Sequence, residues 1–321
     1  MVFWLFIFII TLATLIIAAD FFIKSSERIG LALGIPPFIV GVTLIAVGTS
    51  LPELVTSIVA VLKGPGVSAI VPGNVIGSNI TNICLVLGIV GIAAKKVKLE
   101  FDVMQVDLPM VIGAALVMYL CVMDGEFSLL EGIICLIGLA MYLTYVFSLG
   151  KSSSASAAGM EESDEAQVSK VKLGWRDPLT LLISGIVIYF SADFNVSSII
   201  ELAEIFDIGK EIIALTAVAL GTSLPELVVS IVAVRTNNAE MAIGNVLGSN
   251  IFNIFAVMGI PRLFGEIEVP LTILDFSLPV MMVATGMLLV ILQDRVLTRW
   301  EGSVLALLYL LFMGNLISTQ I

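Results

Sequence analysis

The chain of 321 residues contains no histidine and only three cysteines. The lack of histidine excludes a serine hydrolase that uses a histidine base, and it argues against zinc or copper sites, which favour imidazole and thiolate ligands. The cysteines Cys84, Cys121 and Cys135 lie in apolar stretches without metal-ligand spacing, so we expect them to pack as small core residues. No basic cluster indicates a nucleic-acid partner. We therefore expect neither an enzyme nor a nucleic-acid-binding protein.

Charged residues make up only 13% of the chain and hydrophobic residues 59%, with a mean hydropathy of +1.13. Soluble domains carry about 25% charged residues, so this composition indicates a membrane protein. A helix of about 20 apolar residues crosses the hydrocarbon core of a bilayer. The sequence has ten such spans and predicts an all-α polytopic membrane protein. The predicted spans are 2–23, 38–62, 69–93, 104–123, 127–149, 178–200, 208–234, 240–264, 269–292 and 297–318.

Residues 150–177 form a long polar segment whose composition, KSSSASAAG followed by EESDEAQ, is typical of a flexible acidic linker. If the N-terminus is outside, twelve of the fifteen Lys and Arg residues fall in cytoplasmic loops and three in outer loops. Membrane proteins carry such an excess of positive charge on the cytoplasmic side. We therefore expect an integral protein of the cell (plasma) membrane with both termini extracellular and the central loop cytoplasmic.

Two motifs occur twice in the chain. The heptapeptide GTSLPEL occupies residues 48–54 and returns at 221–227, and GNVIGSNITNI at 73–83 matches GNVLGSNIFNI at 244–254. We infer two five-helix repeats, 1–149 and 178–321, joined by the linker. Their motif regions are 42–91 and 215–260. Because five is odd, the second repeat enters the membrane from the opposite side, which is the architecture of transporters with a site near the midplane between the repeats.

A glutamate stands inside an apolar span in both copies of the heptapeptide. An ionised carboxylate costs at least a few kcal/mol at the centre of a bilayer. The motifs contain no Lys or Arg that could pair with Glu53 or Glu226, so we interpret both as cation ligands. The prolines Pro52 and Pro225 each remove a backbone donor. We therefore expect broken or kinked core helices whose freed carbonyls, beginning at 46 and 219, face an ion.

Further oxygen-bearing side chains share a helix face with these glutamates or with each other. Residues four apart lie on one face of a helix, which groups Thr with Glu in the first motif and Ser with Asn in the second. The glycines of the second motif form small-xxx-small faces that allow close helix approach. The remaining asparagines of this motif are expected to hold helices together; they are Asn74, Asn79, Asn245 and Asn250.

A site of carboxylate, hydroxyl and carbonyl oxygens favours calcium, magnesium, sodium or manganese. A flexible shell of many oxygens suits dehydrated calcium better than magnesium, which prefers a strict octahedron and keeps its water. Two glutamates balance one Ca²⁺ or about two Na⁺, because their combined charge is −2. Competition between these ions for one cage would couple their movement, and we expect antiport by alternating access without any cofactor.

These motifs resemble the α-repeats of the sodium/calcium exchanger branch of the calcium:cation antiporter superfamily. The resemblance covers essentially the whole chain and implies ten helices in two inverted repeats, with four core helices around a central calcium-type site and flanking sodium sites. We expect Ca²⁺ and Na⁺ as substrates and the lipid bilayer as the surroundings, with no obligatory protein partner. The ligands that it implies are Thr49, Ser50, Glu53, Ser78, Asn82, Thr222, Ser223, Glu226, Ser249, Asn253 and the backbone carbonyls of Ala46 and Ala219.

Other functions remain open on the sequence. Many potassium-dependent relatives have an aspartate where this chain has Asn253, and a proton- or potassium-linked calcium exchanger is the main alternative to a sodium/calcium antiporter. A cation channel is a further alternative, although channels are built from several identical subunits around an axis more often than from an inverted repeat. An intramembrane hydrolase would need a base for Ser50 or Ser223, and the chain has no histidine to serve as one.

Overall fold

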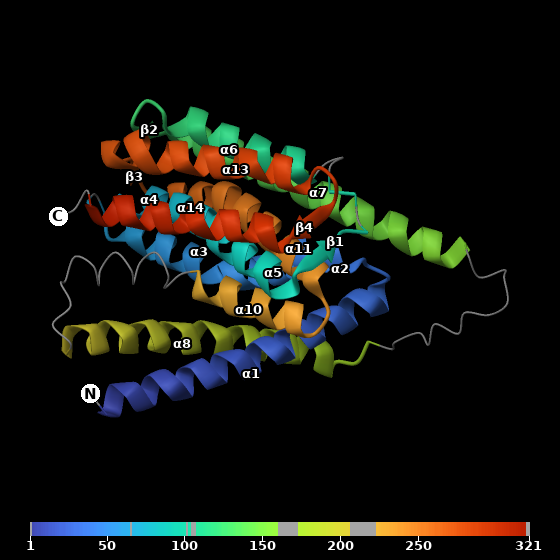
Figure 1. The fold of residues 1–321 in the computed structure, drawn as a ribbon. Coiled ribbons are helices and arrows are strands. Elements are labelled where there is room, and N and C mark those ends of the chain that lie inside the picture. Colours follow the sequence, from blue (N-terminus) through green and yellow to red (C-terminus); the bar gives the residue numbers. More distant parts are fainter. Residues whose placement is uncertain are drawn as a thin grey trace.

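The computed structural model describes residues 2–64, 66–100, 102–103, 107–159, 173–205 and 223–318. These residues form an elongated bundle of helices (Figure 1). The helices of the first repeat are α1 (Val2–Leu33), α2 (Pro37–Val40), α3 (Ala46–Leu62), α4 (Ile70–Ile80), α5 (Leu87–Ala94), α6 (Asp107–Val122) and α7 (Leu129–Gly159). Those of the second are α8 (Arg176–Ile205), α10 (Leu224–Arg235), α11 (Ala239–Phe252), α12 (Met258–Arg262), α13 (Leu278–Leu292) and α14 (Arg299–Ser318).

The structure confirms the predicted all-α membrane fold. Within the described residues, seven helical spans are long and apolar enough to cross a membrane. Three further predicted spans also hold helices. The span 104–123 holds α6, a shorter apolar helix, and 297–318 holds the 20-residue α14. The span 208–234 is described only from 223 onward, where it holds α10.

Core and peripheral helices differ in their surroundings. The helices that carry the repeated motifs lie in the middle of the bundle, and most of the residues in the apolar windows of the spans Ile70–Ala94 and Ala239–Arg262 are buried. The long helices α1 and α8 lie side by side along one edge, and α6 and α13 lie together along the opposite edge (Figure 1). Because α1 and α8 expose large apolar side chains such as Phe6, Ile17 and Phe190, their outer faces suit contact with lipid.

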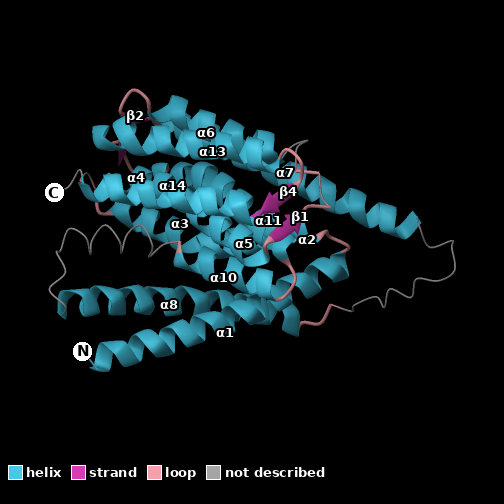
Figure 2. Cartoon of the chain, viewed as in Figure 1, coloured by secondary structure: helices cyan, strands magenta, loops and turns pink. Residues whose placement is uncertain are grey.

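Two short antiparallel ladders tie the repeats together (Figure 2). Strand β1 (Lys96–Lys98) pairs with β4 (Val296–Thr298), and β2 (Glu126–Phe127) pairs with β3 (Ile267–Glu268). Leu108 of the first repeat aligns with Leu278 of the second, which is an offset of 170 residues. With this offset Val97 corresponds to Ile267 and Phe127 corresponds to Leu297. The paired residues Val97 and Leu297 of one ladder are therefore equivalent to the paired residues Ile267 and Phe127 of the other. Each ladder joins one repeat to the other, so the inverted symmetry is built into the backbone pairing.

Glycine contacts follow the same symmetry. A Cβ placed on Gly302 would lie 2.6 Å from the carbonyl oxygen of Gly88, and one placed on Gly259 would lie 3.1 Å from that of Gly132. Each pair brings a core helix of one repeat against the last helix of the other. A side chain on Gly302 would collide with the backbone of Gly88. The glycines therefore allow the helices to approach closely, as small residues do in membrane bundles.

The sequence predicts a bend or a break at Pro52, and the helix is not broken there. Helix α3 continues through Pro52, and the irregular backbone lies before it in a π-helical turn, η1 (Gly41–Ile45). Neighbouring helices can hold a membrane helix together where proline removes one hydrogen bond, and α3 packs against α4, α11 and α12. In the second repeat Pro225 stands in the first turn of α10, where its missing N–H is not needed.

Three more π-helical turns interrupt the long helices: η2 (Thr81–Val86), η3 (Asn253–Val257) and η4 (Ile273–Ser277). The predicted ligand Asn82 lies in η2, and its counterpart Asn253 begins η3. Such turns are frequent at functional sites because they re-aim side chains within a helix. The π-helical turns η2 and η3 therefore coincide with the two copies of the second motif, whereas η1 ends three residues before the first motif.

Candidate ion-binding site

The two motif glutamates meet inside the bundle. Glu53 lies on α3 and Glu226 in the first turn of α10, and both are completely buried. Ser50 stands three residues before Glu53, so the two side chains share a face of α3. The Ser50 hydroxyl donates a hydrogen bond to Glu226 Oε1 across the repeat boundary, with an Oγ–Oε1 distance of 3.2 Å. Ser50 and Glu53 of the first repeat therefore share one site with Glu226 of the second.

Several buried oxygens around these carboxylates have no hydrogen-bond partner among the described residues. Neither glutamate forms an ion pair with a Lys or Arg in that part of the chain. Unpartnered buried acceptors are costly, and a cation is one partner that would satisfy them. The unpartnered atoms are Glu53 Oε1 and Oε2, Glu226 Oε2, Ser223 Oγ, Asn82 Oδ1 and Asn253 Oδ1.

The hydroxyl groups beside the carboxylates are held by a second network. Thr49 Oγ1 donates to Asn245 Oδ1 at 3.2 Å and lies 3.4 Å from the carbonyl oxygen of Ala46, while Ser249 Oγ donates to the same Asn245 oxygen at 3.4 Å. Asn245 Nδ2 in turn donates to Ser230 Oγ at 3.1 Å. Asn245 thus joins α3, α10 and α11 around the site, which is the helix-holding role that the sequence predicts for it.

A quartet of asparagines lies at the crossing of the two second motifs; we define it as Asn79, Asn82, Asn250 and Asn253, all buried. Asn82 Nδ2 donates to Asn250 Oδ1 at 3.2 Å, and Asn253 Nδ2 donates to Asn79 Oδ1 at 3.2 Å. Asn79 and Asn250 also donate to each other's backbone carbonyls, at 3.3 and 3.5 Å. All four bonds cross between the repeats. Asn79 corresponds to Asn250 and Asn82 to Asn253, with an offset of 171 residues, so each bond has a symmetry-related counterpart.

Close backbone contact positions α11 against α2 and η1, which precede the first motif. A Cβ on Gly244 would lie 2.4 Å from the Phe38 carbonyl oxygen, and one on Gly248 would lie 2.4 Å from the Val42 carbonyl oxygen. A Cβ on Gly41 would lie 2.3 Å from the Met241 carbonyl oxygen. The small-xxx-small face predicted at 244 and 248 is therefore in use, and it places Ser249 and Asn245 beside Thr49.

The predicted ligands have different outcomes. The structure brings together Ser50, Glu53 and Glu226, and it places Thr49 and Ser249 around Asn245. Ser78 is buried on α4, and Ser223 is buried at the N-cap of α10, three residues before Glu226. Ala219 and Thr222 lie outside the described residues. Within those residues no group of three or more Cys, Asp or Glu side chains could hold a metal, so a bound ion would depend on two carboxylates supplemented by neutral oxygens.

Sequence reasoning missed two serines. Ser57 and Ser230 are buried and stand four residues after Glu53 and Glu226, so each shares a helix face with its glutamate. Ser230 accepts the hydrogen bond from Asn245, whereas Ser57 Oγ has no partner among the described residues. Their equal spacing from the two glutamates is the signal that would have found them.

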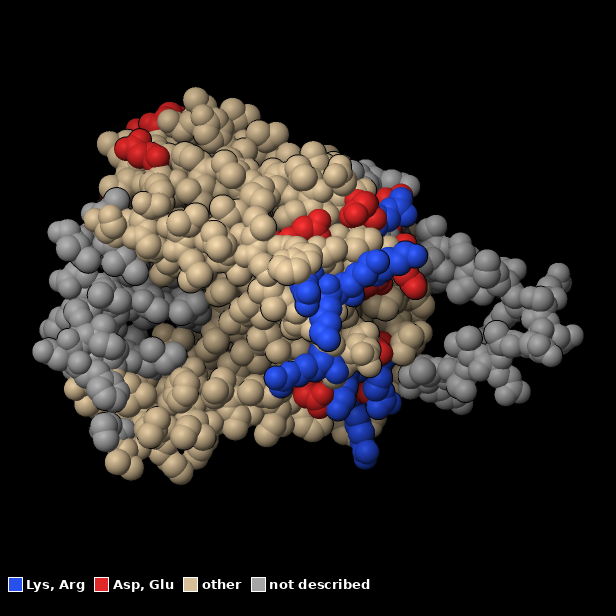
Figure 3. All heavy atoms as spheres, in the orientation of Figure 1, with Lys and Arg blue, Asp and Glu red and all other residues tan. Residues whose placement is uncertain are grey.

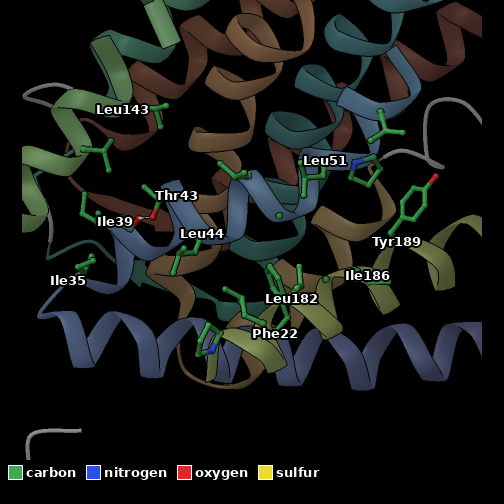
Figure 4. A pocket seen from close by; sticks show the side chains of 18 of the residues that line it. Phe22, Ile35, Ile39, Thr43, Leu44, Leu51, Leu143, Leu182, Ile186 and Tyr189 are labelled. Carbon is green, nitrogen blue, oxygen red and sulfur yellow. Dashed lines mark hydrogen bonds between the residues drawn. The ribbon is translucent and has the colours of Figure 1, made fainter. Parts of the chain in front are cut away.

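The opposite face of α3 borders a separate apolar cavity of about 1110 Å³ (Figure 4). The cavity lies between α3 and the pair α1 and α8, and its lining includes Leu51, Phe22 and Leu182. None of the side chains that carry unpartnered oxygens lines it. Helix α3 therefore turns its polar face to the glutamate site and its apolar face to this cavity.

The fold and the buried carboxylate pair are those of a helical membrane transporter. A family model described as sodium/calcium exchanger protein matches residues 3–148 and 177–317, which is most of the chain. The chain belongs to this sodium/calcium exchanger family.

Curated and solved relatives support the same assignment. The sodium/calcium exchanger MaX1 of Methanosarcina acetivorans is 33% identical over 340 residues, covering 96% of each chain. The inner membrane protein YrbG of Escherichia coli is 32% identical, covering 81% of this chain and 80% of its own. The solved sodium-calcium exchanger NCX_Mj, soaked with Na⁺ and Sr²⁺, is 29% identical with a TM-score of 0.81, covering 98% of this chain and 99% of that one.

Proposed function

We propose that this protein is a secondary active antiporter that exchanges Ca²⁺ for Na⁺ across the membrane, and that it is a transporter rather than an enzyme. The observation that carries this proposal is the meeting of Glu53 and Glu226, one from each repeat, in a fully buried site with unpartnered oxygens. Names of similar proteins add support, because the curated relative MaX1 and the solved relative NCX_Mj are both described as sodium/calcium exchangers.

The chemistry of the site explains why exchange would be coupled. Two ionised carboxylates in a low-dielectric interior repel each other and resist closure of the site when it is empty. One Ca²⁺ or about two Na⁺ neutralise a charge of −2, after which the occupied site can be enclosed. Calcium and sodium then compete for the same oxygens, and each crosses the membrane only in exchange for the other. Alternating access would arise from the two inverted repeats exchanging inward-facing and outward-facing arrangements.

The proposed ligands are the twelve positions that the sequence predicts. The side-chain oxygens of Glu53 and Glu226 supply the charge, and the hydroxyl and amide oxygens complete the shell. Oxygen ligands without nitrogen or sulfur suit calcium and sodium. Ala219 and Thr222 are included by analogy with Ala46 and Thr49 of the first repeat. No cofactor takes part in this scheme.

The distribution of charge supports an orientation. Figure 3 shows Lys and Arg gathered at one end of the visible face, where Figure 1 places β1 and β4, while both marked chain ends lie at the opposite end. Lys95, Lys96 and Lys98 are exposed there. Because cytoplasmic loops are enriched in Lys and Arg, we propose that this end is cytoplasmic and that both termini are extracellular in the plasma membrane. A C-terminal tag that is accessible to protease only in permeabilised cells would contradict this orientation.

Transport into liposomes of purified protein tests the function. Radioactive calcium uptake is measured under an outward gradient of Na⁺, K⁺ or protons, each imposed alone. The proposal expects saturable uptake driven by Na⁺ and absent without a trans cation. Uptake driven only by protons or K⁺ would identify the alternative exchangers. Uptake that needs no trans cation and does not saturate would indicate a channel and overturn the proposal.

A further inference from the structure

The asparagine quartet determines which atom each predicted ligand can present to an ion. Asn79 Nδ2 donates to the backbone carbonyl of Asn250, and a carbonyl oxygen can only accept. The other terminal atom of Asn79 is therefore its oxygen. That oxygen faces the Asn253 amide at 3.2 Å, so the group that Asn253 turns toward it must be the donor, Nδ2. The orientation of Asn253 follows without any assumption about its own oxygen.

The equivalent chain of reasoning holds in the other direction. Asn250 Nδ2 donates to the backbone carbonyl of Asn79 at 3.5 Å, and Asn250 Oδ1 accepts from Asn82 Nδ2 at 3.2 Å. The Oδ1 atoms of Asn82 and Asn253 are consequently the atoms left over. Both are buried and have no partner among the described residues. The quartet thus occupies the amide donors of two predicted ligands and leaves their oxygens available.

We propose that Asn79 and Asn250 are positioning residues that fix the amide orientation of Asn253 and Asn82, so that the site presents oxygen and never N–H to the transported cation. The proposal rests on the proposed function. A rotated amide would direct an N–H donor at the ion, which repels a cation instead of coordinating it. The two positioning residues touch no ion themselves, and they act through the ligand of the opposite repeat.

The proposal also limits the residues that can occupy positions 82 and 253. An aspartate at 253 has no N–H to offer Asn79 Oδ1, so two acceptors would face each other until Asn79 turned its amide and gave up its bond to the Asn250 carbonyl. A carboxylate, however, has two equivalent oxygens and cannot be presented the wrong way round. The need for a positioning residue therefore disappears when the ligand is an aspartate.

This difference between asparagine and aspartate gives a test of whether Asn79 orients the ligand at 253 or only holds the two helices together. Calcium binding to the purified full-length protein is measured by titration calorimetry for Asn79→Ala, for Asn253→Asp and for the double variant. We expect Asn79→Ala to weaken calcium binding about tenfold, the loss of one well-oriented oxygen ligand. In the Asn253→Asp background the same substitution should change the dissociation constant less than about twofold, because no orientation is left to lose.

Equal weakening in both backgrounds would overturn the proposal, since a purely structural tie between helices would be lost equally in both. If Asn79→Ala does not fold, the equivalent cycle of Asn250→Ala with Asn82→Asp tests the other half of the quartet. Asn315→Ala is a matched control, because Asn315 is an exposed asparagine on α14 whose amide donates within its own helix. Absence of calcium binding by the unmutated protein would instead contradict the proposed function.

Discussion

Glu53 and Glu226 occupy the same place in the same heptapeptide, yet their surroundings differ. Glu226 accepts a hydrogen bond from Ser50 of the other repeat, whereas Ser223, the counterpart of Ser50, has no partner among the described residues and leaves both oxygens of Glu53 unpartnered. The two repeats therefore form equivalent backbone ladders, because their sequences repeat. The side-chain contacts of the two glutamates nevertheless differ in this one conformation of the protein. The proposed alternating access would require such an asymmetry, because the inward-facing and outward-facing states would be its two versions.

The largest effect that we expect is the loss of calcium exchange when either carboxylate is replaced. Glu53→Gln and Glu226→Gln each remove half of the site's charge, and we predict that either one lowers calcium-dependent exchange at least about 100-fold, in keeping with the free energy of a buried charged ligand. The measurement is calcium uptake into sodium-loaded liposomes, with Glu126→Gln at an exposed position as the matched control. Normal exchange by either variant would contradict the proposed function.

The next largest effect that we expect is a loss of stability when the close contact between α11 and η1 is overpacked. Gly248→Ala would place a Cβ 2.4 Å from the Val42 carbonyl oxygen. Overpacking of this kind costs about 1–3 kcal/mol, so we predict a lower melting temperature in ion-free detergent. Gly286→Ala on the exposed face of α13, where no described atom lies within 4 Å of the added Cβ, is the control. An equal loss in both variants would contradict the close approach.

A smaller difference is expected at two equivalent turns. Gly125 has φ 85° and Arg295, its counterpart 170 residues later, has φ 59°. A Cβ at Gly125 meets only Leu271, at 4.0 Å, so Gly125→Ala should cost the left-handed backbone strain alone, about 1–2 kcal/mol. Arg295→Gly removes the same strain together with the ion pair to Asp102, so the two effects should largely cancel. Thermal unfolding compares the variants, and a large loss in the second would show that the ion pair outweighs the strain.

The smallest predicted effect addresses the asymmetry directly. Ser50→Ala removes the donor to Glu226, whereas Ser223→Ala removes a hydroxyl without a partner in the described part of the chain. Hydrogen bonds in membrane proteins contribute about 0.6 kcal/mol on average, so ion-free Ser50→Ala should melt at a lower temperature than Ser223→Ala. Identical melting temperatures would mean that the two half-sites are equivalent in solution.

The sequence predicted much of this arrangement because its motifs repeat. The meeting of Glu53 and Glu226 in one site and the helix-holding role of Asn245 followed from polar groups that an apolar span cannot leave without partners. The two ladders were not predicted, because strands of two or three residues have no periodicity and their partners lie in the other repeat.

Local backbone geometry was also beyond the sequence. Proline at 52 was expected to bend or break its helix; tertiary packing keeps α3 unbroken, and the π-helical turn lies earlier, at Gly41–Ile45. The difference between Ser50 and Ser223 could not be predicted at all, since the two serines have identical sequence neighbours from Gly to Leu. Only the choice of one conformation distinguishes them.

Competition between the two ions at the buried carboxylates tests the central claim most directly. Calcium binding to the purified protein is titrated at rising sodium concentration, with Glu53→Gln measured in parallel. If Glu53 and Glu226 form one shared site, sodium raises the apparent calcium dissociation constant steeply, and the variant loses calcium binding together with the competition. A calcium dissociation constant that does not respond to sodium, or calcium binding that survives in the variant, would contradict the account.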